Sequence, residues 1–242
     1  MPSPSVRPDR PGPLGVWLSA VFKAWQITEV ELEAFRRGPS FRGSSVSEAA
    51  RAVTRSARAE HERHGFGFWE FVLAESRNTD AETQRALIFN ALGHSAAESV
   101  TIRTTPGTLE FCFDRAVFEE LPERSVVSLC SRVSSPIGIQ HLPMLDFGVG
   151  PGNGGLRAAI DAATQLGMRG AIYASGRSMH MFGDTFIAER EMRHLLARAQ
   201  LLSPIVDARW ASHQLIDDNC RLRISTDVSR HREAHEPLAY LP

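Results

Sequence analysis

The segment LDFGVGPGNGG, residues 145–155, constrains the fold more than any other part of the sequence. It continues the hydrophobic run IQHLPM at 139–144, and it leads through closely spaced glycines into a stretch whose apolar residues recur at helical spacing from 156 to 166. Residues 170–174 are again apolar and of strand length. The pattern predicts a strand over 139–146, a glycine-rich turn, a helix and a second strand. It places Asp146 at the end of the first strand.

The rest of the chain divides at about residue 98. Residues 1–14 are rich in proline and predict a disordered lead-in, whereas 15–97 predict a helical region with helices over 16–37, 68–75 and 80–92 and a helix that begins at a capping box of Ser45 and Glu48. From 98 to 226 strands dominate, with a helix over 185–201. The further predicted strands cover 100–103, 109–113, 125–133 and 220–225, with 178–182 returning as a hairpin. Residues 227–242 predict a polar C-terminal tail. The fold class is therefore α+β.

Composition excludes several classes of protein. With 242 residues, 43% of them hydrophobic, the chain can bury a core, and a net charge of −1 excludes a generally basic nucleic-acid-binding protein. Three widely spaced cysteines without a CxxC pair argue against a disulfide framework and a structural zinc site. The start lacks the apolar core of a signal peptide, and no run is long enough to span a bilayer. We expect a cytoplasmic protein that does not bind membranes.

The glycine-rich turn permits two interpretations. Locally it looks like the strand–turn–helix signature with which class I methyltransferases bind S-adenosylmethionine. Such a fold requires an acidic residue near the end of the next strand, and the residues there, IYASGR at 172–177, include no carboxylate. It also requires five further strands, and fewer than a hundred residues follow the turn. The alternative is that Asp146 is the functional residue and the glycines carry the chain from the strand into its helix.

A second motif favours the aspartate. YASGRSMH at 173–180 combines a turn of small residues with a histidine that alternation places on the same face as Ser178. By itself this motif is most simply a hairpin with a half-buried histidine. It is followed, however, by Asp207 and by the arginine-bearing segment RLRIS at 221–225, in which two arginines two positions apart point to one face.

This ordered set resembles the palm of the archaeo-eukaryotic primase superfamily, which includes the primase-polymerases. The matching segments are PMLD at 143–146, SGRSMH at 175–180, IVD at 205–207 and RLRIS at 221–225. The resemblance implies an RRM-like palm over residues 98–226 and a primase-like nucleotidyltransferase that binds NTP or dNTP. It also implies a nucleic-acid template, with DNA favoured over RNA, and a divalent cation, Mg²⁺ or Mn²⁺.

The resemblance also implies a role for each matching residue. Asp146, Asp207 and His180 would be catalytic, and the two aspartates would bind the metal ion. The triphosphate would be bound by His180 and by the turn residues Ser175, Gly176, Arg177 and Ser178. Arg221 and Arg223 would contact phosphates of the nucleotide or the template.

One position departs from the family pattern. The second acid expected two residues after Asp146 is replaced by Gly148, which is similar to a single-aspartate, "1D-like" branch of bacterial primase-like proteins. Asp184 or another carboxylate would have to substitute for it in a two-metal site. The alternative function is a catalytically degenerate palm that binds nucleotides or nucleic acid in a replication or defence complex. In that case a partner protein would dock on the helical N-terminal region.

Overall fold

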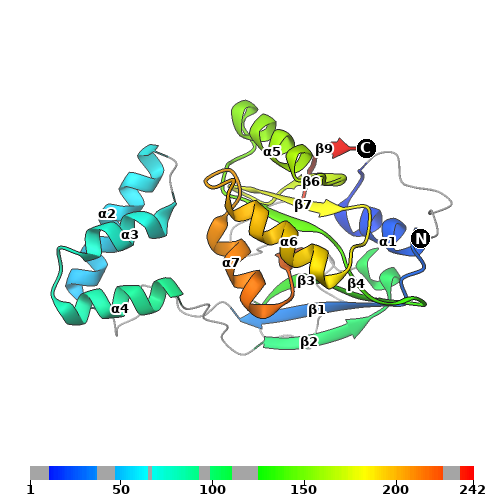
Figure 1. The fold of residues 1–242 in the computed structure, drawn as a ribbon, viewed down its shortest axis with the longest axis horizontal. Coiled ribbons are helices and arrows are strands. Elements are labelled where there is room, and N and C mark those ends of the chain that lie inside the picture. The colour runs from blue at the N-terminus through cyan, green and yellow to red at the C-terminus, as the bar shows by residue number, and fades with distance from the viewer. Residues whose placement is uncertain (1–10, 37–46, 65–66, 93–98, 111–124, 226–234) are drawn as a thin grey trace. The chain divides into compact units, whose positions relative to one another are not determined.

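The computed structural model describes residues 11–36, 47–64, 67–92, 99–110, 125–225 and 235–242 (Figure 1). The chain forms two compact units: residues 1–36 together with 98–242 make up the larger, and 37–97 the smaller. The predicted α+β class is confirmed. No helix among the described residues combines the length and apolar character needed to cross a membrane.

The first sheet of the larger unit is antiparallel throughout, with strand order β2-β1-β3-β4 and β8 paired to β3 beside β4. Alternation in β1 buries Val30, Leu32 and Ala34 on one face and leaves Glu31 and Glu33 on the other. The strands of this first sheet are β1 (Glu29–Arg36), β2 (Ser99–Thr104), β3 (Ser125–Ser135), β4 (Gly138–His141) and β8 (Arg221–Arg223).

The second sheet has the order β5-β7-β6-β9, and every pair in it is antiparallel. Because β5 and β6 both pair with β7, they run in the same direction with β7 between them. Helix α5 (Asn153–Gln165) connects them as in a split β-α-β unit. β6 and β7 form the predicted hairpin. The strands are β5 (Met144–Phe147), β6 (Gly170–Ala174), β7 (Met179–Gly183) and β9 (Pro237–Leu241).

This topology bears on the methyltransferase interpretation. A dinucleotide- or cofactor-type glycine loop acts at the edge of a parallel sheet, between neighbouring strands. Among the described residues every strand pair is antiparallel, and β7 separates the two strands that flank the loop. The glycine-rich turn therefore lacks the setting that the methyltransferase interpretation requires.

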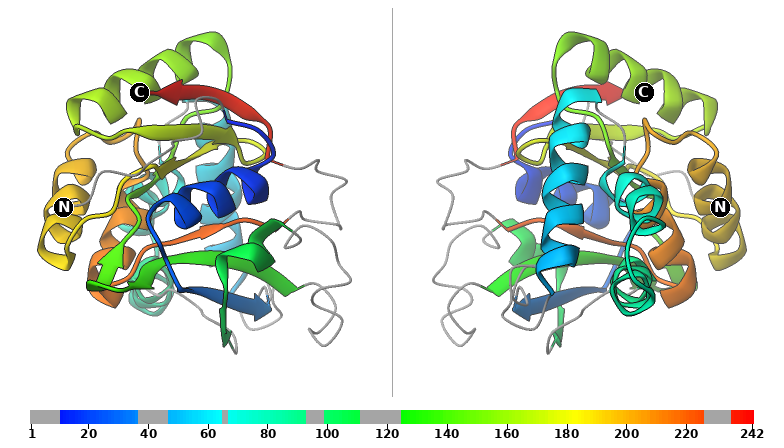
Figure 2. Two further views of the ribbon diagram at one scale, coloured as in Figure 1. Left: turned by 90° about the vertical axis from the view of Figure 1, so that its right-hand side faces the viewer. Right: turned by 90° about the vertical axis from the view of Figure 1, so that its left-hand side faces the viewer.

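Helix α1 (Leu14–Ala24) lies between the two sheets (Figure 2). Its Trp17 ring lies 6.0 Å from the Tyr173 ring of β6, and the Tyr173 hydroxyl donates to the Gly12 carbonyl. The short helix η1 (Pro106–Glu110) packs beside it. The remaining helices of this unit are α5 (Asn153–Gln165), α6 (Glu189–Gln200) and α7 (Ala208–Asp217). One continuous apolar core joins both sheets and α1.

The smaller unit consists of α2 (Glu48–His64), α3 (Phe68–Ser76) and α4 (Ala81–Leu92), in agreement with the predicted helices. The hydroxyl of Ser47 accepts the Ala50 amide at 3.1 Å, so Ser47 caps α2. The predicted cap, Ser45, lies outside the described residues. The unit has a small core of its own, formed by Ala50, Val53, Ala57, Val72 and Leu87.

Several predicted boundaries are wrong. Residues 29–36 were predicted as the end of a helix and form β1, because their alternating glutamates and apolar residues fit a half-buried strand. The predicted strand over 139–146 is two strands in different sheets, β4 and β5, with Pro143 between them. In the predicted strand over 109–113, Leu109 and Glu110 belong to η1 and the rest lies outside the described residues. The predicted tail over 227–242 contains β9, while residues 226–234 lie outside the described part. Helix α7 was not predicted.

Two cysteines offer a direct check of this core. Cys130 in β3 and Cys220 before β8 are buried, and burial raises the pKa of each thiol to about 12. Because the thiolate is the reactive form, we expect both to resist iodoacetamide at about pH 8 in the native protein and to react in denaturant. Peptide mapping by mass spectrometry measures this. Alkylation of either cysteine in the native protein would contradict the packing described here.

Candidate functional site

Asp146 lies in a row of three residues across the second sheet. Its register partner in β7 is His180, whose partner in β6 is Tyr173, so the three side chains share one face. The Asp146 Oδ1 and His180 Nε2 atoms are 3.6 Å apart. The Asp146 side chain keeps 23% of its surface exposed, whereas that of His180 keeps 7%. The carboxylate is thus accessible and the imidazole is largely covered.

Asp207 lies beside Asp146 because the chain before α7 runs along the end of β5. The Asp207 amide donates to the Asp146 carbonyl at 2.9 Å, and the Gly148 amide donates to the Ile205 carbonyl at 2.9 Å. Asp207 is also the N-cap of α7, where its Oδ1 accepts the Trp210 amide at 2.9 Å. The structure therefore brings the two predicted aspartates together, with one oxygen of Asp207 engaged in the cap.

Burial dominates the electrostatics of the site. It raises the pKa of the Asp146 carboxyl well above its usual range, the neighbouring Asp207 charge raises it further, and Arg223 partly offsets both. The pKa of His180 is lowered well below its usual range, first by burial and then by His235 and Arg223. The site therefore disfavours a negative charge on Asp146 unless a cation accompanies it.

The predicted triphosphate-binding turn lies at the end of the β6–β7 hairpin. The Ser175 amide donates to the Ser178 carbonyl at 2.9 Å, and the two hydroxyls are 3.0 Å apart. Gly176 has a φ of 100°, which favours glycine. A Cβ atom added at Gly150 would lie 2.9 Å from the Arg177 carbonyl oxygen, so the glycine-rich segment packs directly against this turn. The two sequence motifs are thus neighbours in space.

The two arginines of β8 have different surroundings. The Arg223 guanidinium donates to the Ser175 carbonyl at 2.7 Å and to the Ser225 carbonyl at 2.9 Å, which places it beside the turn. Arg221 instead forms ion pairs with Glu33 at 2.7 Å and with Asp217 at 3.0 Å. Arg223 lies at the site, whereas the guanidinium of Arg221 is engaged by two carboxylates.

The structure leaves no room for an acid at position 148. A Cβ atom there would lie 2.7 Å from the Pro204 carbonyl oxygen. Asp184 directly follows β7, four residues beyond His180 and thus about 13 Å away in the strand direction. Its Oδ2 accepts the Tyr240 hydroxyl at 3.0 Å. It therefore does not substitute for the missing acid. Within the described residues no group of three His, Cys, Asp or Glu side chains is arranged to hold a metal ion.

His235 is a residue of the site that the sequence did not reveal. It lies in the predicted tail, just before β9, and is 4% exposed with its ring centroid 5.6 Å from that of His180. Burial lowers the pKa of His235 to about 4. The apolar pattern of β9 was the available signal, because a strand there would carry the preceding residue into the fold.

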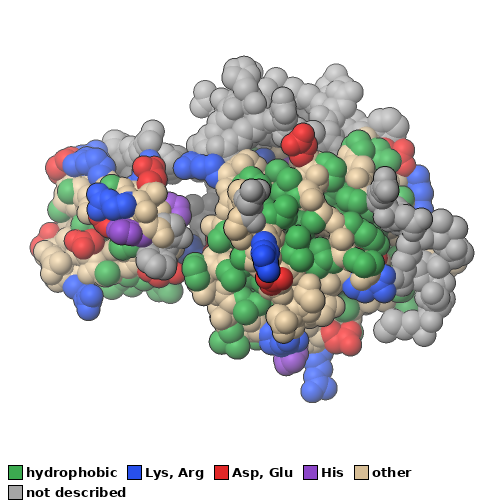
Figure 3. Space-filling view, turned by 90° about the horizontal axis from the view of Figure 1, so that it is seen from above, with side chains coloured by type: hydrophobic (Ala, Val, Ile, Leu, Met, Phe, Trp, Pro, Cys, Tyr) green, Lys and Arg blue, Asp and Glu red, His purple; other side chains and the backbone are tan. Residues whose placement is uncertain are grey.

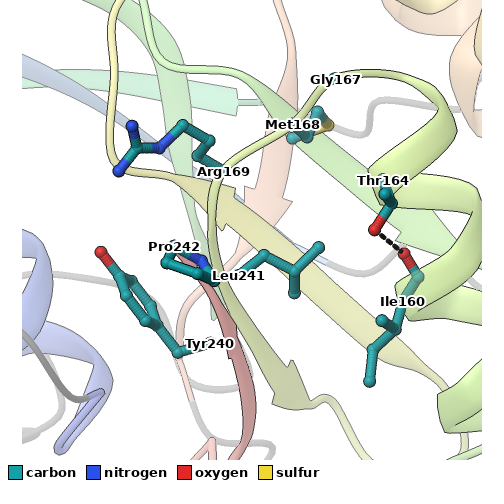
Figure 4. Close-up of a pocket in the computed structure, with 8 residues that line it drawn as sticks. All are labelled: Ile160, Thr164, Gly167, Met168, Arg169, Tyr240, Leu241 and Pro242. Atoms are coloured by element: carbon teal, nitrogen blue, oxygen red, sulfur yellow. Dashed lines mark hydrogen bonds between the residues drawn. The ribbon is translucent and has the colours of Figure 1, made fainter.

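A separate pocket of about 440 Å³ lies between α5 and β9. Arg169 and Tyr240 lie on one side of it, and Ile160 and Thr164 on the other (Figure 4). Many apolar side chains are visible on the larger unit when the molecule is viewed from above (Figure 3). None of the pocket-lining residues belongs to the Asp146 site, so the pocket is separate from the predicted metal- and nucleotide-binding residues.

A protein-family model described as AEP-like, archaeo-eukaryotic primase 1D-like, matches residues 105–236, more than half of the chain. The matched span contains Asp146, His180, Asp207, Arg223 and His235. No curated protein and no solved structure matches the chain significantly.

Proposed function

The chain belongs to the archaeo-eukaryotic primase 1D-like family, and from this premise we propose that its palm binds a nucleoside triphosphate with a divalent cation and transfers nucleotides on a nucleic-acid template. The family supplies a primase-like nucleotidyltransferase fold. The observation that carries the proposal is the proximity of Asp146, Asp207 and His180 at the end of β5. These residues come from three separate elements of the chain.

The donor set fits a divalent cation. Asp146 is a partly exposed carboxylate whose ionisation burial and Asp207 both disfavour, and a cation between the aspartates would relieve both effects. Asp207 has one carboxylate oxygen beyond the one used in its helix cap. Asp146 and Asp207 would hold Mg²⁺ or Mn²⁺, which in nucleotidyl transfer neutralises phosphate charge and polarises the α-phosphate.

The neighbouring turn supports binding of the phosphates. Gly176 and Arg177 are exposed at its tip, and Arg223 holds its first carbonyl in place. Backbone amides in such a turn, together with a guanidinium, are suited to phosphate oxygens. We place the triphosphate over this turn, with its α-phosphate toward Asp146.

Position 148 favours a second candidate function. Because the Pro204 carbonyl occupies the space that a second acid would need, the site has one acid on β5 where a two-metal mechanism uses a pair. A palm of this kind could bind nucleotide or nucleic acid without catalysis, as a subunit of a replication or defence complex, with a partner protein on the helical unit. Binding without synthesis distinguishes this candidate from the first.

Calorimetry with ATP and dATP, with and without Mn²⁺, tests the proposal. We expect binding only with the cation, and a loss of at least about tenfold in affinity in Asp207→Asn. Asparagine is itself a good N-cap, so this variant removes the charge while α7 keeps its cap. Asp161→Asn, in an exposed position of α5, is the matched control. Nucleotide affinity that changes neither on removal of the cation nor in Asp207→Asn would contradict the proposal.

A template-extension assay with the same protein separates the two candidates. Cation-dependent binding followed by extension of a primed DNA or RNA template supports the nucleotidyltransferase. Cation-dependent binding without synthesis on either template supports the non-catalytic palm.

A further inference from the structure

We propose that His180 is a metal ligand in this chain, and that its Nε2 and the Asp146 Oδ1 bind one divalent cation that is preferentially a first-row transition-metal ion such as Mn²⁺. The inference rests on the proposed function, because it assigns the ligands of the cation in the same site. It differs in the role of His180, which the family resemblance assigns to the triphosphate.

The two atoms are spaced as ligands of one ion. Their separation is 3.6 Å, which is less than two ligand bonds of about 2.1 to 2.2 Å laid end to end. Their register places them directly opposite each other on adjacent strands. The register therefore brings the two side chains together, and burial of the His180 ring restricts one of them.

A direct hydrogen bond between the two groups does not account for the arrangement. Hydrogen bonds between nitrogen and oxygen span about 2.7 to 3.2 Å, and an atom pair at 3.6 Å lies outside that range. The carboxylate is only 23% exposed and has a second carboxylate, Asp207, beside its backbone. A cation between Oδ1 and Nε2 would satisfy both atoms without moving either strand.

The His180 ring is held in place from several sides. The Phe182 ring packs edge-on to it at 6.3 Å, and the His235 ring lies 5.6 Å away. The Nδ1 atom of His180 is buried and lacks a partner at full hydrogen-bonding geometry. The backbone of Arg223 nevertheless interacts with the imidazole and raises its pKa slightly against the larger lowering by burial. Ligating histidines are commonly oriented by a hydrogen bond from the nitrogen that does not face the metal, whereas the orientation of His180 is fixed by packing against the two rings.

The missing acid explains why a histidine would take this role. A carboxylate at position 148 is excluded by the Pro204 carbonyl, so β5 supplies a single oxygen ligand. His180 offers the next donor on the same face, and nucleotide phosphates and water would complete the coordination. Mg²⁺ prefers oxygen ligands alone, whereas an imidazole nitrogen raises affinity for first-row transition metals relative to Mg²⁺.

Pulsed electron paramagnetic resonance of bound Mn²⁺ tests the assignment on the unmodified full-length protein. We expect a nitrogen coupling that changes when histidine is isotopically labelled in its ring nitrogens, with Mn²⁺ alone or with Mn²⁺ and ATP. Bound Mn²⁺ without a histidine coupling would overturn the inference, and so would the absence of bound Mn²⁺ in both samples. The measurement needs no variant, so it does not depend on the folding of a mutant.

Metal selectivity gives a second readout. We expect His180→Asp to lower the ratio of Mn²⁺ to Mg²⁺ affinity by at least about tenfold, whereas His194→Asp on the exposed face of α6 leaves it unchanged. An unchanged ratio in His180→Asp together with weakened ATP binding would assign His180 to the triphosphate and overturn the inference. In that case the proposed function stands. Conversely, a histidine coupling to Mn²⁺ in a protein that binds no nucleotide would support the ligand assignment and refute the proposed function.

Discussion

Replacing Asp146 with asparagine is expected to reduce nucleotide transfer by at least about a thousandfold, since charge stabilisation by a bound metal is worth several kcal/mol and each 1.4 kcal/mol is a factor of ten. Asparagine keeps the size of the side chain and the backbone bond to Asp207, so the change removes the charge without opening a cavity. Single-turnover extension at saturating ATP and Mn²⁺ measures the effect. Transfer that persists at the wild-type rate would exclude Asp146 from the reaction.

The same variant is expected to be at least as stable as the wild type at pH 7. The pKa of Asp146 is raised in the folded protein, so the folded state holds this proton more tightly than the unfolded state does. Stability therefore falls as the pH rises from the unfolded pKa through the folded pKa, and asparagine removes that loss. Urea unfolding at pH 7 separates lost activity from lost folding. A large drop in stability would show that Asp146 is instead a structural residue.

Introducing the missing acid as Gly148→Asp is expected to lower the free energy of unfolding by about 3 kcal/mol, the upper end of the range for overpacking. The new Cβ would lie 2.7 Å from a backbone oxygen, that of Pro204, and the Gly148 amide is bonded to Ile205. Pro204 and Ile205 belong to the segment that positions Asp207, so neither residue can move away from Gly148 without displacing Asp207. We therefore expect a loss of cation-dependent nucleotide binding and no gain of activity.

Gly152→Asp is the matched control for this prediction. A Cβ atom at Gly152 meets nothing within 4 Å, and Gly152 is the N-cap of α5, where aspartate is favourable. Its stability should stay within about 0.5 kcal/mol of the wild type or rise slightly. If Gly148→Asp proved as stable as Gly152→Asp and increased activity, the segment at Pro204 would be adaptable and the site would accept a second acid.

Sequence patterns predicted the elements around the site well because those elements are local. The strand end at Asp146, the glycine-rich turn, the following helix and the β6–β7 hairpin each depend on alternation, helical period or small turn residues within a few positions. The four segments that carry the primase resemblance also lie next to one another in the fold, because Asp146 pairs with His180, Asp207 bonds to Asp146 and Arg223 bonds to Ser175. The metal and nucleotide roles of Asp146, Asp207 and His180 stay predictions.

The errors arose where tertiary packing decides the structure. The segment before Arg36 has apolar residues that fit both periods, and only pairing with β2 and β3 makes it a strand. Pro143 is a local sign that the strand over 139–146 is interrupted, but nothing local shows that the chain changes sheets there, or that His235 packs against His180. Arg221 illustrates the same limit for the site, because its partner Glu33 lies almost two hundred residues earlier in the chain.

The position of the helical unit has a consequence for how this protein can change. Residues 37–97 leave and re-enter the first sheet between β1 and β2, where Phe35 and Ser99 are register partners, so the two ends of the insertion stand about 5 Å apart. A short hairpin turn could close the same gap. The helical unit is thus an insertion within a β-hairpin, and its replacement by a short turn would leave the pairing of the strands that carry Asp146 and His180 unchanged.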